Sequence, residues 1–229
     1  RLRMLELIIA TAVFFTTHAL PAHRPLRDAL INRLGRRFYL VLYSIVTAAV
    51  LVWVGLAYAG APHIEVWPMA EWMRWVPALV MPFACIFLVS GLAAPNPLSV
   101  GKAAADFDAG RPGIVSVTRH PVMWSLVLWA AAHVPPNGDA ASLILFGLML
   151  VLGLTGPPSL DNKRRAQLGV EAWQHLAGPT SSIPFAAVLA GRVRLDFRGM
   201  GISAPLGGLA LYGVFLWGHE WVVGLSPIP

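Results

Sequence analysis

Three histidines, His18, His133 and His219, lie inside long apolar stretches of this sequence. An ionisable side chain near the centre of a membrane span costs at least ~2.5 kcal/mol, so such a residue is a candidate for function by default. A neutral imidazole can bind a metal or a haem iron. The alternative for each histidine taken alone is a hydrogen bond to a carbonyl of a neighbouring helix.

Counting residues along the expected helices places two of these histidines at similar depth. His18 lies 12 residues beyond Glu6 in a helix that runs inward, and His133 lies 12 residues beyond Pro121 in a helix that runs outward. Each distance is ~18 Å along a helix, so in a ~30 Å hydrocarbon core the imidazoles differ in depth by only ~6 Å. Two such imidazoles favour haem, and a lone metal ion less, because no cysteine or carboxylate accompanies them. His219, ~24 Å from the inner side by the same count, is a weaker candidate.

Arg119, His120 and Pro121 form a second cluster of candidate residues. Proline suits the first turn of a helix, where its missing N–H costs nothing, so a helix is predicted to begin at Pro121. The N-terminus of that helix favours an anion such as a phosphate, a carboxylate or a haem propionate. The alternative is that these residues only start the helix and anchor it at the membrane edge. Arg24 and Arg27, after the first apolar stretch, either reach the same inner site or only set the orientation.

Six apolar stretches must position these residues. The 229-residue sequence has a mean hydropathy of +0.65, with 57% hydrophobic and 12% charged residues. A typical soluble domain has about 25% charged residues, so disorder is excluded and lipid is the expected solvent. Because a span needs ~20 apolar residues, we predict an all-α membrane bundle, a single domain over 1–229, with about six transmembrane helices near 4–20, 38–61, 75–94, 121–136, 140–158 and 202–225. The fourth range is short, and a re-entrant or deeply packed helix is its alternative.

The basic residues give the expected orientation. If the spans alternate, 14 of the 17 Lys and Arg residues fall in three segments on one side, at 21–37, 95–120 and 159–201. Lys and Arg collect on the cytoplasmic side of short loops, so we expect a multi-pass protein of a bacterial inner membrane with both termini periplasmic. The net charge of +6 is then explained by topology, and no nucleic-acid partner is expected. The first stretch lacks a clear cleavage site and is expected to remain as a span.

An ordered set of short motifs runs along nearly the whole chain. It consists of His18 with Pro25-Leu26-Arg27 and Leu34-Gly35, residues 39–44, Gly113-Ile114, Thr118-Arg119-His120-Pro121, Leu128-Trp129-Ala130 with His133, Asn137-Gly138-Asp139, Asp161 with Arg164-Arg165, Gly169, and Ile183-Pro184-Phe185. In this order and spacing the set resembles the NnrU family, whose plant branch is 15-cis-zeta-carotene isomerase.

That resemblance implies a membrane fold of about six helices and, for the isomerase branch, a haem b with two axial histidines. The matching residues here are His18 and His133. If haem is bound, we expect Arg119, with Arg24 or Arg27, near its propionates and His120 and Trp129 among the cofactor-binding residues. The isomerase branch has a cysteine three residues before the second histidine, where this sequence has Ala130. The bacterial members are associated with denitrification and nitric oxide metabolism.

A second resemblance rests on part of the same motif set: Arg-His-Pro, an acidic helix, Gly169 with Trp173 four residues later, and Ile183-Pro184. These features are similar to isoprenylcysteine and phospholipid methyltransferases. They imply S-adenosylmethionine bound at the cytoplasmic face by Arg119, His120 and an acidic partner, for which Glu171 is the candidate. The glycine usual shortly after the proline is replaced here by Ser125.

The sequence is therefore compatible with three candidate functions. The leading one is a haem b membrane protein that carries out redox-gated cis–trans isomerisation of a hydrophobic polyene or carotenoid. The second is a methyltransferase that uses S-adenosylmethionine. The third is a non-enzymatic haem sensor or assembly factor related to nitric oxide or denitrification. For each of these functions we expect the protein to be surrounded by membrane lipid.

Overall fold

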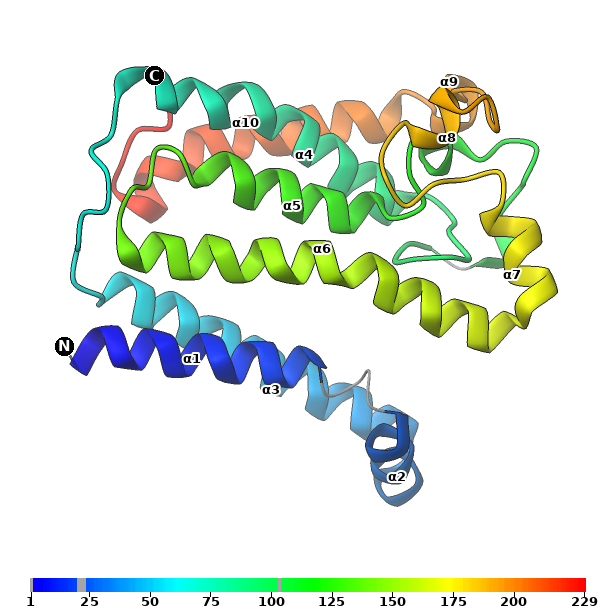
Figure 1. Cartoon of the computed structure of the whole chain (residues 1–229), viewed down its shortest axis with the longest axis horizontal. Coiled ribbons are helices and arrows are strands. Elements are labelled where there is room, and N and C mark those ends of the chain that lie inside the picture. The colour runs from blue at the N-terminus through cyan, green and yellow to red at the C-terminus, as the bar shows by residue number, and fades with distance from the viewer. Residues whose placement is uncertain (1, 20–23, 103) are drawn as a thin grey trace. The chain divides into compact units, whose positions relative to one another are not determined.

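The computed structural model describes residues 2–19, 24–102 and 104–229, and among these it contains helices and no β-strand beyond isolated bridges. The predicted all-α class is therefore confirmed. The α-helices are α1 (Leu2–Ala19), α2 (Arg24–Leu34), α3 (Arg36–Ala59), α4 (Trp75–Ala93), α5 (Pro121–His133), α6 (Ala140–Leu168), α7 (Val170–Ala177), α8 (Ala186–Leu189), α9 (Phe197–Met200) and α10 (Ser203–Val223) (Figure 1). Within the described ranges, short 3-10 helices lie at Glu71–Arg74, Ala104–Asp106 and Gly113–Ser116.

Three helical stretches of the described chain are long and apolar enough to cross a membrane. They are Arg36–Ala59, Glu71–Ala93 and Ala140–Leu168, and their most apolar windows have mean hydropathies of 2.0 to 2.3. Helix α5 is also apolar but has 13 residues, which is ~20 Å of helix against a ~30 Å core. Three spans are thus supported by length and composition, and the count of six stays a prediction.

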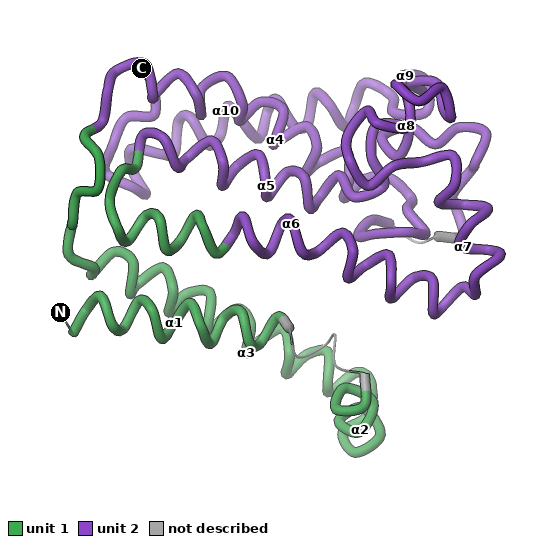
Figure 2. The backbone as a smooth tube through the Cα atoms, viewed as in Figure 1, with its two compact units in different colours: residues 1–68, 137–148 green, residues 69–136, 149–229 purple. Residues whose placement is uncertain are grey.

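The chain divides into two compact units, Arg1–Pro68 with Asn137–Leu148 and Met69–Pro136 with Met149–Pro229 (Figure 2). In the first unit α1 packs against α3. Leu7, Ala10 and Phe14 of α1 are buried, as are Val54 and Ala57 of α3. These residues are the apolar faces that helical periodicity places toward a neighbouring helix.

Two polar side chains of the first unit have clear structural roles. Glu6, the acidic residue of the first apolar stretch, accepts a hydrogen bond from Trp53 Nε1 at 3.3 Å. Asp139 precedes α6, and its Oδ1 accepts from the backbone N–H groups of Ala141 and Ser142 at 3.0 and 3.1 Å. This is an N-cap, which satisfies donors that the first turn of a helix leaves unpaired.

In the second unit α4 is the central helix, because both α5 and α10 pack against it. Glycines permit the close approach. A Cβ placed on Gly208 of α10 would lie 2.6 Å from the Cα of Ile86, and one on Gly91 of α4 would lie 2.8 Å from Pro121 Cγ. Small residues at such contacts are typical of helix pairs in membranes, where close packing replaces the hydrophobic drive.

The segment between α4 and α5 folds back against these two helices. Ile114, Val115 and Val117 form a buried cluster with Phe87, and Trp124 packs against it. The sequence predicted a basic loop here, and the structure adds that several of its apolar side chains are buried. The segment therefore sets the position of Arg119 and His120, which follow directly.

Two helices depart from the predicted boundaries. The segment predicted as a loop at 21–37 contains α2, whose Pro25 stands in the first turn as prolines prefer; residues 20–23 lie outside the described chain. Helix α6, predicted to end at Pro158, continues through Pro157 and Pro158 to Leu168. Tertiary contacts of the polar extension, described below, outweigh the cost of proline inside a helix.

Candidate functional site

Helix α5 begins at Pro121, the position predicted from the sequence, with His120 as the residue before it. The His120 imidazole is fully buried. Its Nδ1 lies 2.9 Å from Ser99 Oγ and its Nε2 lies 3.1 Å from Asp161 Oδ1. A carboxylate only accepts hydrogen bonds, so Nε2 donates to Asp161, and in the neutral ring Nδ1 accepts from the Ser99 hydroxyl.

Arg119 binds the same carboxylate from another direction. Its Nε donates to Asp161 Oδ1 at 2.9 Å and its Nη2 donates to Oδ2 at 2.6 Å. This is a two-point contact between a planar guanidinium and a carboxylate, and such charge-assisted pairs are the strongest hydrogen bonds in proteins. Burial by itself raises the pKa of Asp161, but the hydrogen bonds from His120 and Arg119 and the charge of Arg119 outweigh it and lower the pKa to about 2.

Further bonds connect this pair to the neighbouring segments. Asn96 Nδ2 donates to the Arg119 carbonyl at 3.0 Å, and Arg164 Nη2 donates to the Ser99 carbonyl at 3.0 Å. The segment after α4, the start of α5 and the polar end of α6 are thus joined in one network. Asp161 and Arg164 belong to the part of α6 that extends past the apolar range, which explains why the extension is helical.

Ser99, His120 and Asp161 are the residue types of a nucleophile, a base and an orienting acid. Their burial argues against that chemistry, since Ser99 is 1% exposed and His120 is 0% exposed. A substrate carbonyl has no access to a serine enclosed in this way. We therefore interpret the network as a structural connection that fixes the base of α5.

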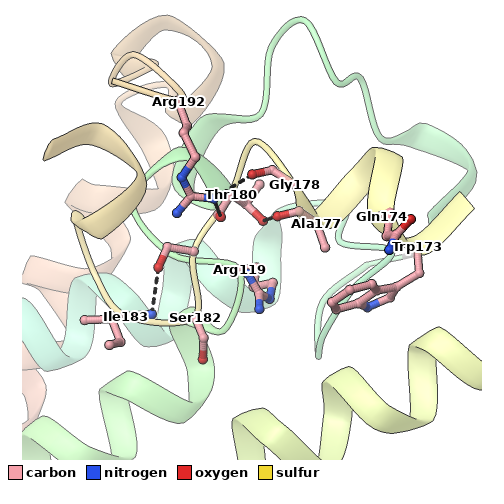
Figure 3. A pocket seen from close by; sticks show the side chains of 10 residues that line it. Arg119, Trp173, Gln174, Ala177, Gly178, Thr180, Ser182, Ile183 and Arg192 are labelled. Carbon is pink, nitrogen blue, oxygen red and sulfur yellow. Dashed lines mark hydrogen bonds between the residues drawn. The ribbon is translucent and has the colours of Figure 1, made fainter. Parts of the chain in front are cut away.

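A pocket of about 410 Å³ opens next to Arg119 (Figure 3). Arg119, Trp173 and Arg192 reach it from three separate segments, and the loop from Gly178 to Ile183 forms its rim. The Trp173 ring has two cationic neighbours: the guanidinium carbons of Arg119 and Arg165 lie 5.9 and 5.8 Å from its centroid. Such distances are typical of cation–π contacts.

His133 is the last residue of α5, in the second unit. Its Nδ1 lies 2.7 Å from the Trp129 carbonyl, and its ring centroid lies 5.6 Å from the Trp129 ring. Because a carbonyl oxygen only accepts, the Nδ1 of His133 carries a proton. In the neutral ring the lone pair is then on Nε2.

His18 has the same local arrangement at the end of α1, in the first unit. Its Nδ1 lies 2.9 Å from the carbonyl of Phe14, four residues earlier, and the two ring centroids are 4.1 Å apart. The neutral tautomer is again the one with its lone pair on Nε2. In the neutral form of both histidines, Nδ1 therefore carries the proton and Nε2 is the unprotonated nitrogen.

Each imidazole, taken by itself, has the hydrogen-bond arrangement of a metal-bound histidine. An imidazole that ligates a metal almost always donates its other N–H to a carbonyl or carboxylate, which fixes the ring and its tautomer. Both His18 and His133 meet that requirement through their own helices. The described residues contain no cluster of three or more His, Cys, Asp or Glu side chains that would suit a metal ion alone.

The other predicted residues have contacts of their own, and His219 is close enough to His133 for their charges to interact. His219 Nδ1 lies 2.8 Å from the Leu225 carbonyl near the end of α10. In α2, Arg27 Nη1 lies 3.7 Å from Asp28 Oδ1, and the Arg24 side chain lies outside the described part of the structure. Glu171, the candidate acidic residue of an S-adenosylmethionine site, is exposed on α7, and the carboxylate in contact with His120 is that of Asp161.

The part of the site that sequence reasoning missed is the role of Asp161 and Ser99. The sequence showed Asp161 as one residue of the motif set and as the acidic residue of a basic run, 161–165, without a role of its own. A single carboxylate among four polar or basic neighbours is a signal for internal pairing. Ser99 gave no signal, because its contact with His120 depends on how the preceding segment folds back.

Comparison with known proteins agrees with the motif set. The family model described as NnrU protein matches residues 6–227. The chain is 34% identical over 83 residues to the chloroplastic 15-cis-zeta-carotene isomerase of Zea mays, a match that covers 36% of this chain and 22% of that protein. No solved structure matches the chain. With a family model that spans nearly every residue, this all-helical membrane protein belongs to the NnrU family.

Proposed function

We propose that this protein is a membrane-embedded isomerase of a polyene or carotenoid that binds haem b through His18 and His133. The observation that carries the proposal is the shared arrangement of the two imidazoles, each donating from Nδ1 to the carbonyl four residues earlier in its own helix. Similarity to a carotene isomerase over 83 residues supports the substrate class. The depth count along the sequence supports their pairing.

The residues of the chain have defined tasks in this proposal. The carbonyls of Phe14 and Trp129 hold the proton on each Nδ1, so each Nε2 is presented as a donor atom. The adjacent aromatic rings limit rotation of the imidazoles. Ala130 is fully buried where the isomerase branch has a cysteine, so a thiol is absent at that point of the helix. When bound, haem supplies an iron that can change its oxidation state.

The proposed cis–trans isomerisation needs no co-substrate. A cis–trans isomerisation rotates one double bond and leaves the atoms and electrons of the product equal to those of the substrate. The protein then has to bind an apolar chain, exclude water and control access to the bound cofactor. An apolar bundle with few charges is suited to these tasks.

The test is conversion of a 15-cis polyene by the purified, haem-supplemented protein in liposomes under reducing conditions, followed by chromatography of the isomers. We expect the trans product from the wild type and at least a tenfold lower rate for His133→Ala, since a ligand to the cofactor is lost. His219→Ala is the matched control and should keep the wild-type rate. No conversion by haem-loaded protein would refute the isomerase, and nitric oxide binding in that sample would favour the sensor.

The methyltransferase is a separate proposal with its own measurement. It requires S-adenosylmethionine near Arg119, and Arg119 lines the pocket of Figure 3. Calorimetric titration with S-adenosylhomocysteine tests it directly. Detectable binding that Arg119→Gln removes would favour it over the isomerase.

A further inference from the structure

The pocket between α7 and the loop from Gly178 to Ile183 has features that the haem proposal does not use. It lies wholly in the second unit and is lined by Arg119, Trp173, Arg192 and a polar loop (Figure 3). The hydrogen bonds and charges of these lining residues indicate which kind of ligand the pocket suits.

Arg192 contributes a positive charge whose position is fixed. Its Nη1 donates to the carbonyls of Gly178 and Thr180 at 2.6 and 2.8 Å. Both bonds come from one terminal nitrogen, and the contacts recorded among the described residues leave Nη2 and Nε unengaged. A guanidinium presented in this way matches the geometry of a phosphate or carboxylate.

Trp173 contributes a donor that has no acceptor. Its Nε1 is buried and makes no hydrogen bond within the described chain. A buried N–H without a partner is uncommon and calls for a specific explanation. The ring is also flanked by the guanidinium groups of Arg119 and Arg165, so an acceptor at this N–H would lie in a positive environment.

The charge balance around the pocket is positive. The charge of Arg119 is offset by Asp161, with which it forms a salt bridge at 2.6 Å. Arg165 and Arg192 form no recorded salt bridge in the described chain, and Glu171 in the first turn of α7 is the nearby acidic residue. The pocket therefore favours an anion over a neutral or cationic ligand.

Exposed apolar side chains end the pocket loop and follow it in the sequence. Ile183 lines the pocket and is 63% exposed, while Phe185 and Leu189 are 45% and 86% exposed. Phe185 has a left-handed backbone, with φ 63°, and its N–H donates to the Val117 carbonyl at 2.8 Å. The fold thus keeps an apolar edge at this place despite a strained backbone conformation.

We propose that this pocket binds the headgroup phosphate of an anionic phospholipid, with Arg192 and the Trp173 N–H as its ligands. The acyl chains lie along Ile183, Phe185 and Leu189. A polar anion site with an apolar edge suits an amphiphile, whereas a soluble phosphate would have no use for that edge. The proposal does not depend on haem.

Native mass spectrometry of the full-length protein in detergent tests this, with titration of phosphatidylglycerol and, separately, phosphatidylcholine. We expect one tightly bound phosphatidylglycerol. We expect about tenfold weaker binding in Arg192→Gln and in Trp173→Phe, the latter removing the N–H and keeping the ring. Arg198→Gln is the matched control: it removes an equal charge from exposed α9 and should bind like the wild type.

Three results would overturn the proposal. They are equal affinity in Arg192→Gln and Arg198→Gln, no preference for phosphatidylglycerol over phosphatidylcholine, and binding of inorganic phosphate that requires Arg192 while the lipid does not bind. Gel filtration and helix content of each variant show whether it is folded. If Arg192→Gln does not fold, Trp173→Phe gives the decisive comparison.

Discussion

Asp161 is the residue on which the polar network of the second unit depends. It accepts hydrogen bonds from Arg119 and His120, and no other acidic side chain is recorded in contact with these two residues. Removing it would leave a largely buried guanidinium and a fully buried imidazole without their acceptor. Uncompensated groups of this kind account for most large destabilisations caused by polar substitutions.

We predict that Asp161→Asn lowers the free energy of unfolding by about 2–3 kcal/mol at pH 7, since a charge-assisted pair is lost and its partners stay buried. Chemical or thermal unfolding of the protein in detergent measures this. Asp106→Asn, an exposed acid without a recorded partner, is the matched control and should change stability by less than about 0.5 kcal/mol.

The pKa shift fixes how this difference depends on pH. The pKa of Asp161 falls from an ordinary 3.8 to about 2 in the folded protein. Because folding lowers this pKa, ionised Asp161 stabilises the folded protein fully at pH values above its pKa in the unfolded chain. This stabilisation is lost as the pH falls through its pKa in the folded protein. The gap between wild type and Asp161→Asn should therefore shrink between about pH 4 and pH 2. A gap that stays constant in this range would contradict the assigned pairing.

At the scale of elements, the periodicity and length of the apolar stretches predicted where the main helices lie. Tertiary contacts determined features that this pattern does not specify, such as the C-terminal end of α6. Helix α4 was expected at 75–94 and spans Trp75–Ala93, because an uninterrupted apolar run leaves little choice. The continuation of α6 to Leu168 depends on Asp161 and Arg164, whose partners are distant in sequence. Helix α2 is short and highly charged, and it gives no long apolar pattern to detect.

The contact between α10 and α4 gives a prediction at this scale. A Cβ on Gly208 would lie 2.6 Å from the Cα of Ile86, which is backbone and cannot move aside alone. We therefore expect Gly208→Ala to destabilise the second unit by about 1–3 kcal/mol. Gly218→Ala in the same helix is the control, because nothing lies within 4 Å of its added methyl group, and alanine favours a helix by up to about 1 kcal/mol. Thermal unfolding of the two variants should separate them, and equal melting temperatures would refute the close contact.

At the scale of the whole molecule, composition predicted a membrane protein and the motif order predicted its family, and both agree with the findings. The candidate site was predictable to the extent that the histidines stand out against an apolar background. His18 and His133 are visible for that reason. The Ser99–His120–Asp161 network was not predictable, because its members are polar residues in polar segments and meet only through folding.

The charge distribution predicts that Asn162 and Glu71 lie on opposite sides of the membrane, with Asn162 cytoplasmic. Single cysteines at these positions, Asn162→Cys and Glu71→Cys, can be tested in a Cys85→Ala background, since Cys85 is the one natural cysteine. In intact bacterial cells expressing the protein, an impermeant thiol reagent should label position 71 and spare position 162 until the cells are opened. Labelling of both positions in intact cells would contradict the assigned orientation.

The central proposal is that His18 and His133 would together hold a haem. The optical spectrum of haem-supplemented wild type beside His18→Ala, His133→Ala and His219→Ala tests it most directly. We predict a low-spin haem spectrum in the wild type and in His219→Ala, and its loss or conversion to high spin in each of the other two variants. Wild-type protein without a Soret band, or an unchanged low-spin spectrum in both His18→Ala and His133→Ala, would contradict the claim.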